Sequence, residues 1–246
     1  MLHREVAQGI HRVEDAWVNW YLIEDGEALT VVDAGVPASW SSLQNALGAL
    51  GRKTSDIGAL VLTHAHLDHV GFAERLRAEH GVPIWVHEDD VPLTKRPLTY
   101  TTERSPLPYL RNAAPRSIMV AMVRAGILWT KRIAEVNRFG DDGALDVPGS
   151  PRIVYTPGHT LGHTSFHLPD RDVVIAGDAL VTREPYTGGT GPQLVARAAT
   201  ADSERALASL DRLSETGAST LLPGHGPPWN QGAAEAARRA TEAGLS

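Results

Sequence analysis

Three histidines and an aspartate lie within six positions of the chain, at His64, His66, Asp68 and His69, directly after an apolar run that ends at Leu62. Imidazole and carboxylate groups are the ligands that suit zinc, manganese or iron in proteins. Because His64 and His66 are two positions apart, an extended chain points both side chains to the same side. The sequence contains no cysteine, so nitrogen and oxygen atoms must bind any metal. This motif therefore indicates a metal site.

Further donors follow at three turns that contain glycine, and each turn comes after an apolar, strand-like segment. They are His159 in Pro-Gly-His-Thr, Asp178 in Ala-Gly-Asp, and His225 in Pro-Gly-His-Gly. Glycine beside a donor permits unusual backbone angles and close approach, which helps to aim a ligand from a tight turn. Four donors in the first motif are too many for one tetrahedral ion, which in catalytic sites takes three protein ligands and a water. We therefore expect two adjacent metal ions.

Segments of alternating or continuous apolar residues predict the elements that position these donors. The expected strands span residues 16–23, 28–32, 59–62, 83–87, 152–155, 164–168, 173–176 and 219–222. The expected helices span residues 37–51, 70–80 and 202–216, and an alanine-rich helix closes the chain. Two β-rich halves flanked by helices predict an α/β protein in which two sheets pack face to face with helices outside. We expect one domain over residues 1–246.

Residues 91–146 interrupt this pattern and are expected to form a helical insertion. Within it, residues 91–140 hold nine basic and two acidic side chains, a net charge of +7 in a chain whose total is −6. One interpretation is a lid whose apolar residues line a pocket and whose arginines meet an anionic group. The apolar candidates are Met119, Met122, Ile127, Leu128 and Trp129. The alternatives are a helix that is simply buried, with its arginines in solvent, or a contact with a second subunit in a homodimer.

Composition excludes several classes of partner. A net charge of −6 and a pI near 6.0 argue against a nucleic-acid binder, because phosphate backbones are met by clustered lysine and arginine. No segment has the roughly 20 apolar residues that span a bilayer, and the N-terminus lacks the pattern of a signal peptide. We therefore expect a cytoplasmic protein that acts on a small molecule, either apolar or anionic.

The run Thr-His-x-His-x-Asp-His at residues 63–69, with the three glycine-containing turns after it, resembles the metallo-β-lactamase superfamily, and residues 31–35 resemble its early acidic motif. The resemblance implies a four-layer αβ/βα sandwich with a dinuclear metal site at one edge. It implies a first metal held by His64, His66 and His159, a second held by Asp68, His69 and His225, and Asp178 as the bridge between them. Asp33 would order the ligand loop, and His87 and His163 are candidates for orienting ligands.

This resemblance implies a metal-dependent hydrolase with two divalent cations, zinc first and iron or manganese as alternatives. A metal lowers the pKa of bound water toward roughly 7, so a hydroxide held between two metals can attack a carbonyl. We expect the substrate to be an ester, a lactone or a thioester. Asp68 is the candidate catalytic residue, because it could orient the hydroxide or carry a proton.

The family's activities are distinguished by further residues. The bridging aspartate and the absence of cysteine disfavour true β-lactamases. The Gly-Cys-Gly-Arg-like stretch of glyoxalase II-like thioesterases is replaced by residues 179–183, Ala-Leu-Val-Thr-Arg. The tyrosine of acyl-homoserine lactonases is replaced by Val181, although Tyr186 on the same loop could substitute for it. A phosphodiesterase, a persulfide dioxygenase-like non-haem iron oxidoreductase and a non-enzymatic, metal-stabilised module remain as alternatives.

Overall fold

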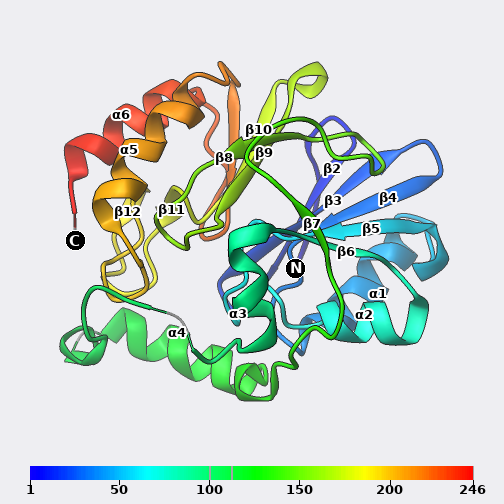
Figure 1. Cartoon of the computed structure of the whole chain (residues 1–246), viewed down its shortest axis with the longest axis horizontal. Coiled ribbons are helices and arrows are strands. Elements are labelled where there is room, and N and C mark those ends of the chain that lie inside the picture. Colours follow the sequence, from blue (N-terminus) through cyan, green and yellow to red (C-terminus); the bar gives the residue numbers. More distant parts are fainter. Residues whose placement is uncertain (100, 112, 246) are drawn as a thin grey trace.

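Thirteen strands form three sheets in the part of the chain that the computed structural model describes, residues 1–99, 101–111 and 113–245 (Figure 1). The larger sheet has the order β1 (Leu2–Ala7), β2 (Ile10–Asp15), β3 (Val18–Asp25), β4 (Ala28–Val32), β5 (Ile57–Val61), β6 (Ile84–His87) and β7 (Asn137–Phe139). The second sheet has the order β13 (Thr220–Pro223), β10 (Val173–Gly177), β9 (Thr164–Leu168) and β8 (Arg152–Tyr155). A small ribbon pairs β11 (Val181–Arg183) with β12 (Thr190–Gln193).

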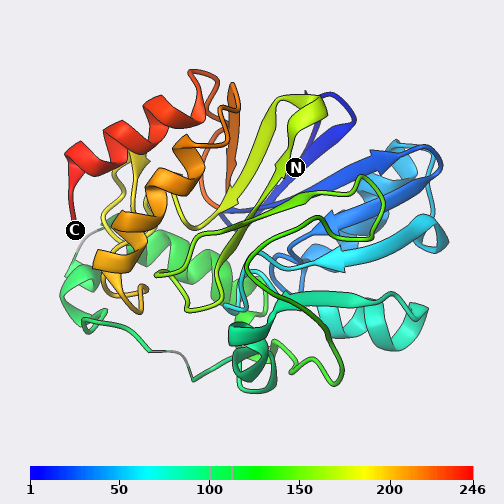
Figure 2. The ribbon, with the colours of Figure 1, turned by 45° about the horizontal axis from the view of Figure 1, so that its top comes forward.

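Helices cover the outer faces of the two main sheets (Figures 1 and 2). The larger sheet is covered by α1 (Ser39–Ala49) and α2 (Ala73–His80), and the second sheet by α5 (Ser203–Ser214) and α6 (Ala233–Ala243). Between the halves of the sequence lie the short α3 (Val91–Lys95) and α4 (Ala113–Arg124). Among the described residues, none of these helices has the length and apolarity that crossing a bilayer demands.

Side chains along β3 alternate between the two faces of the larger sheet, so this strand packs against helices on one face and against the second sheet on the other. Trp20 and Leu22 pack outward against α1 and α2, and Trp20 meets the ring of Phe72 at 5.3 Å between centroids. Tyr21 and Ile23 point to the opposite face and belong to the core between the two sheets. Successive side chains of a strand alternate between faces, so a strand that is apolar on both faces must be covered on both.

The second sheet is sandwiched in the same way. Val173 and Ile175 of β10 pack against the larger sheet, while Val174 packs against α5 and α6. The layers therefore run helix, sheet, sheet, helix. This confirms the predicted fold class, an αβ/βα sandwich.

Several elements differ from the sequence-based expectation. The strands β1 and β2 were not predicted, since their many charged residues hide the alternation. The segment 91–146 contains α3 and α4 and also β7, which pairs in parallel with β6 as the edge strand of the larger sheet. The ribbon β11–β12 was also missed, because strands of three and four residues give little periodic signal.

The topology brings the candidate donors to one edge of the sandwich. Strands β4 and β5 are parallel neighbours in the larger sheet, and β10 and β13 are parallel neighbours in the second. The early acidic motif and the histidine run follow the first pair, and the turns with Asp178 and His225 follow the second pair. The carboxyl ends of parallel strands lie at the same sheet edge, so donors far apart in the sequence can converge there.

Candidate metal centre

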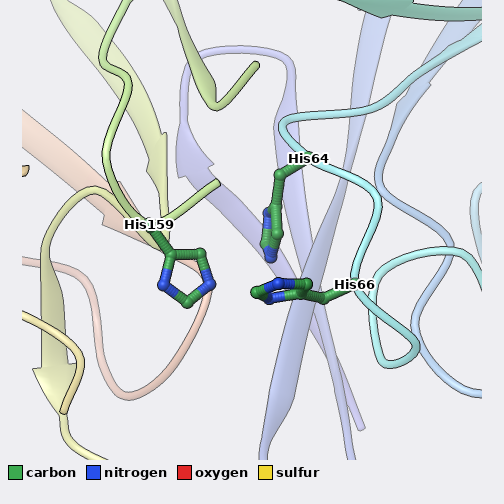
Figure 3. Close-up of side chains that lie close together, drawn as sticks. All are labelled: His64, His66 and His159. Carbon is green, nitrogen blue, oxygen red and sulfur yellow. The ribbon is translucent and has the colours of Figure 1, made fainter. Parts of the chain in front are cut away.

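The first group of donors consists of His64, His66 and His159. Their nearest ligand atoms all lie within 4.8 Å of one another, and all three residues are buried. The ring centroids of His64 and His66 are 4.8 Å apart, and that of His159 is 4.8 Å from the first ring and 4.6 Å from the second. Figure 3 shows the three rings turned toward one another from two separate loops. Three converging imidazoles match the protein ligand set of a catalytic zinc site.

The second group consists of Asp68, His69 and His225, whose nearest ligand atoms also lie within 4.8 Å of one another. Asp68 Oδ2 is 3.9 Å from His69 Nε2 and 3.5 Å from His225 Nε2. Asp68 is the most exposed member of the group, with 16% of its side chain accessible. The structure therefore places a carboxylate and two imidazoles beside the first group.

Asp178 lies between the two groups. Its Oδ2 atom is 3.5 Å from His159 Nε2 in the first group, and 3.7 Å from His69 Nε2 and 3.2 Å from His225 Nε2 in the second. One carboxylate thus contacts both sets of imidazoles. The structure therefore brings together all seven of the side chains singled out in the sequence, including the one expected to bridge.

Glycines make room for this carboxylate. A Cβ atom at Gly224 would lie 2.0 Å from Asp178 Oδ1, and one at Gly177 would lie 2.8 Å from Thr63. Gly177 also has a φ of +53°, in the left-handed region that glycine adopts without steric cost. The turns before Asp178 and His225 therefore need glycine for close approach.

Asp33 links the ends of β4 and β5 and orients two of the imidazoles. Its Oδ1 accepts a hydrogen bond from Thr63 N at 2.8 Å, and its Oδ2 lies 2.8 Å from Thr63 Oγ1 and 2.9 Å from His69 Nδ1. Because the Thr63 hydroxyl donates to Asp33, its oxygen accepts from His64 Nδ1 at 3.0 Å. The Nε2 atoms of His64 and His69 then face the other donors, which is how a metal-binding histidine is usually held.

Two further candidate ligands, His159 and His225, are oriented in a similar way. His225 Nδ1 donates to the carbonyl oxygen of Trp17 at 2.8 Å, and His159 Nδ1 lies 3.4 Å from Thr200 Oγ1. His163 Nε2 accepts the backbone N–H of Asp178 at 3.0 Å, so this histidine positions the central carboxylate without contributing to the donor set. The other histidine considered for such a role, His87, contacts Asp89, Asp141 and Tyr155 instead, none of which is a candidate ligand.

Asp90 is a functional residue that the sequence analysis missed. Its buried carboxylate accepts hydrogen bonds from Ala65 N at 2.9 Å, from Thr160 Oγ1 at 2.8 Å and from Gly162 N at 2.9 Å. Ala65 lies between two candidate ligands, and Thr160 follows a third. Asp90 therefore fastens together the two loops that carry the first group. Its only sequence signal is a position at the end of a strand, within an acidic run that resembles a solvated turn.

Burial and mutual repulsion keep the first group neutral. Burial lowers the pKa of His64 and His159 well below the usual value, and neighbouring imidazoles lower that of His64 further. Burial likewise lowers the pKa of His66 to about 4. At pH 7 these rings are uncharged, which is the protonation state that a metal ligand requires.

The second group has the opposite electrostatics. Burial opposes the charged form of His69, but Asp178, Asp33 and Asp68 outweigh it and raise its pKa to about 10. Burial likewise opposes the charged form of His225, and Asp178 and Asp68 raise its pKa to about 9. Burial also opposes ionisation of Asp178, yet the same imidazoles hold its pKa well below the usual range. These carboxylates thus favour positive charge at a buried position. A bound cation would supply the same charge.

The donor atoms fit metal ions for a second reason. Within the described residues, Nε2 of His64, His69 and His159 and Oδ1 of Asp178 are buried and make no hydrogen bond. Buried polar atoms are rarely left without a partner, and several of them converging on one place point to a bound ion. The set contains nitrogen and carboxylate donors without sulfur, which suits zinc, iron or manganese.

A cavity of about 170 Å³ opens onto this cluster. Its lining combines donors from both groups with apolar side chains. The cavity is lined by His66, Leu67, Asp68, Pro106, Ile118, Met119, Met122, Ile127, Leu128, His159, Asp178, Pro185, Tyr186, Val195, Ala199 and His225. Four of the five apolar residues expected to line a pocket therefore do so. Trp129 does not, and this residue is 70% exposed.

Comparison with known proteins finds similar sequences and a similar fold. The sequence model of the metallo-beta-lactamase superfamily matches residues 17–225. The chain is 27% identical over 240 residues to the probable metallo-hydrolase YflN of Bacillus subtilis, covering 91% of this chain and 86% of that protein. It is 29% identical over 136 residues to the hydroxyacylglutathione hydrolase GloC of Haemophilus influenzae, covering 55% of this chain and 53% of that protein. The crystal structure of TTHA1623 in a di-iron-bound form superposes with a TM-score of 0.63 at 24% identity, covering 93% of this chain and 96% of that one.

The chain belongs to the metallo-β-lactamase superfamily. Its class is that of the metal-dependent hydrolases, as the histidine motif predicted.

Proposed function

We propose that this protein binds two divalent cations, zinc in the first instance, and hydrolyses an ester, a lactone or a thioester. The observation that carries the proposal is the position of Asp178, whose Oδ2 atom lies 3.5 Å from His159 Nε2 and 3.2 Å from His225 Nε2. A carboxylate shared in this way between two sets of imidazoles suits a pair of neighbouring ions. The partial match to GloC, named as a hydrolase of hydroxyacylglutathione, supports a thioester as one of the three bond types.

In this proposal His64, His66 and His159 hold one cation, Asp68, His69 and His225 hold the other, and Asp178 contacts both. Bound divalent cations supply a Lewis acid for a carbonyl oxygen and lower the pKa of water toward neutrality. The protein's own contribution is to keep the first three imidazoles neutral by burial and to orient four of the five rings through contacts of their Nδ1 atoms.

Asp68 is proposed as the residue that handles the proton. Its carboxylate lines the cavity and is the most exposed of the seven donors, so it can meet both water and the substrate. From this position Asp68 orients the attacking water, takes its proton and passes that proton to the leaving group. The remaining donors are buried, and their oxygen and nitrogen atoms face one another.

The proposal is tested by metal analysis and turnover of three variants, with p-nitrophenyl acetate, γ-butyrolactone and S-acetyl-N-acetylcysteamine as substrates. Asp178→Ala and His66→Ala each remove a proposed ligand, and we expect loss of at least one metal equivalent and a fall in kcat/KM of about 100-fold or more. His80→Ala is the control, because this exposed histidine ends α2 away from the cluster. Full metal content together with full turnover in both ligand variants would contradict the assignment.

Metal analysis also separates the proposal from its alternatives. Two equivalents of zinc, iron or manganese with hydrolytic turnover support it. A single equivalent of iron, together with oxygen consumption when a persulfide is added, would indicate an oxidoreductase instead of a hydrolase. Turnover of bis-p-nitrophenyl phosphate in preference to all three carbonyl substrates would replace it with a phosphodiesterase. The phosphodiesterase is opposed by the lining of the cavity, because no lysine or arginine is among the described residues that form it.

A further inference from the structure

Apart from the candidate ligands, the cavity is lined by an apolar wall, and most of this wall comes from two separate segments. One is α4 with the turn after it, which contributes Ile118, Met119, Met122, Ile127 and Leu128. The other is the loop around the β11–β12 ribbon and before α5, which contributes Pro185, Tyr186, Val195 and Ala199. We infer that this wall receives an uncharged, apolar acyl or alkyl group of the substrate. The inference rests on the proposed function and names the class of substrate that it acts on.

Packing holds the first segment against the body of the protein. Ile118, Met122 and Ile127 are buried in one cluster with Val18, and Leu67 of the histidine loop packs against the same cluster. The apolar side of α4 is therefore tied to the candidate metal centre itself. A substrate carbonyl at the ligands would place its apolar substituent against these side chains.

The second segment is held by a buried carboxylate. Glu184 accepts hydrogen bonds from Tyr186 N at 2.8 Å, from Thr187 N at 2.5 Å and from Ala196 N at 3.1 Å. Both ends of this loop are thereby fastened to one side chain. Tyr186 also packs edge to face on Tyr109 at 5.8 Å between ring centroids, which joins the loop to the segment before α4.

The charge of the side chains around the wall should make it select against anionic substrate groups. No lysine or arginine is among the described residues that line the cavity. Eight of the nine basic residues in 91–140 have described side chains, and all eight are exposed; Arg111 lies outside the described side chains. Arg197, close to the loop, is already paired with Glu103 at 2.6 Å. A carboxylate on the acyl chain would lose its water here without gaining a cationic side chain as partner, which is costly.

Size restricts the substrate further. The cavity volume of about 170 Å³ is below the roughly 300–1,000 Å³ of pockets that take drug-sized ligands. A short or medium alkyl chain therefore suits the wall better than a bulky conjugate. Of the two partner chemistries expected from the sequence, the apolar one is favoured over the anionic one.

The experiment compares matched thioesters in the metal-loaded protein, with the released thiol measured by a colorimetric reagent. We use S-hexanoyl- and S-glutaryl-N-acetylcysteamine, which have the same leaving group and differ in that a carboxylate replaces the terminal ethyl group of the acyl chain, and the two corresponding p-nitrophenyl esters. The inference predicts that kcat/KM for the hexanoyl substrate exceeds that for the glutaryl substrate by at least about 30-fold, because binding the glutaryl chain leaves a charge unpaired. Equal rates, or a preference for the glutaryl substrate, would overturn it.

Two neighbouring substitutions on α4 make the test specific to the wall. Met119 lines the cavity and Val120 does not, and their side chains are 43% and 48% exposed, so a lysine at either position should leave folding intact. Met119→Lys should reduce the hexanoyl preference at least about tenfold by giving the carboxylate a partner. Val120→Lys should leave it unchanged, and identical effects of the two substitutions would contradict the inference.

Failure of the inference and failure of the proposed function give different results. If the protein hydrolyses these substrates but prefers the charged chain, the proposed hydrolase function is supported and the inference that the wall selects apolar chains is wrong. If protein that holds two metal equivalents hydrolyses none of the four carbonyl substrates and does not hydrolyse γ-butyrolactone, both the proposed function and the inference are overturned.

Discussion

Thr160 Oγ1 donates a hydrogen bond of 2.8 Å to the carboxylate of Asp90, a residue 70 positions earlier in the chain. The bond crosses from the loop after β6 to the loop after β8, and the same carboxylate also accepts Ala65 N and Gly162 N. Three loops are therefore held by one buried side chain. Since two of these loops carry His64, His66 and His159, the geometry of the first donor group depends on a residue that is not a proposed ligand.

The first prediction is that Asp90→Asn weakens both folding and metal binding. An amide has one oxygen acceptor, so its NH₂ group would face a donor that Asp90 now satisfies. Charge-assisted hydrogen bonds to buried groups contribute about 1.5–3 kcal/mol each, and we expect the free energy of unfolding to fall by about 2–4 kcal/mol. Urea denaturation and metal titration measure the two effects. The control is Asp89→Asn, an exposed neighbour; an Asp90 variant as stable as this control would refute the prediction.

The second prediction concerns Asp33, whose backbone φ of +63° lies in the left-handed region. Asparagine adopts this conformation readily, so Asp33→Asn changes the carboxylate without straining the backbone. If the amide oxygen keeps the hydrogen bond from Thr63 N, the amide NH₂ group faces His69 Nδ1 as a donor. The neutral ring that a metal requires would then carry its single proton on Nε2, the atom that faces the other donors. We expect metal affinity to fall about 10- to 100-fold, measured by competition with a chelating dye. Unchanged affinity would show that Asp33 does not set the tautomer.

The candidate site was more predictable from the sequence than the contacts that hold it. The seven donors stand beside glycines or in one short histidine run, so residue type and spacing identify them. Asp90 gave no such signal, because its burial depends on Thr160 and Gly162, which are distant in the sequence. Thr63 was also missed as a link, since only the fold shows that its hydroxyl connects Asp33 with His64.

The fold, like the site, was predictable where the local sequence carries a clear pattern and not where the structure depends on distant contacts. Strands that are buried on both faces, such as β5 and β10, are continuous apolar runs that stand out from their surroundings. Edge strands have one partner or face solvent, so β1 and β7 mix charged and apolar residues and give no clear pattern. Trp129 shows a further limit: apolarity predicted that it faces the cavity, but the turn after α4 directs it outward.

The third prediction is that cations displace protons from the second donor group. The carboxylates around His69 and His225 overcome burial and raise the pKa values of these residues to about 10 and 9, so both are protonated at pH 7 before metal binds. Loading the second site should release about two protons, and affinity should rise with pH up to about 10. Calorimetric titration of the metal in two buffers with different ionisation enthalpies counts the protons. An identical heat in both buffers would contradict the prediction.

The same shifts predict how the stability of the metal-free protein depends on pH. A histidine whose pKa is raised in the folded state stabilises the fold fully below its unfolded value of about 6.5, and this contribution is lost as the pH rises through 9 and 10. The thermal midpoint of the metal-free protein should therefore fall between pH 7 and pH 10. The metal-loaded protein should show a smaller fall, because the cations replace those protons. A flat profile for the metal-free protein would be inconsistent with the ion pairs of His69.

The fourth prediction separates substrate binding from metal binding. Glu184→Gln removes one of the oxygens that hold the loop behind Tyr186 and Val195, and it leaves the seven proposed ligands unchanged. Because the loop forms one side of the apolar wall, we expect KM for S-hexanoyl-N-acetylcysteamine to rise about tenfold, which corresponds to one charge-assisted hydrogen bond. Metal content and kcat should stay close to those of the wild type. Glu204→Gln, an exposed change in the first turn of α5, is the control. If Glu184→Gln lost metal instead, this carboxylate would support the candidate ligands and not the wall.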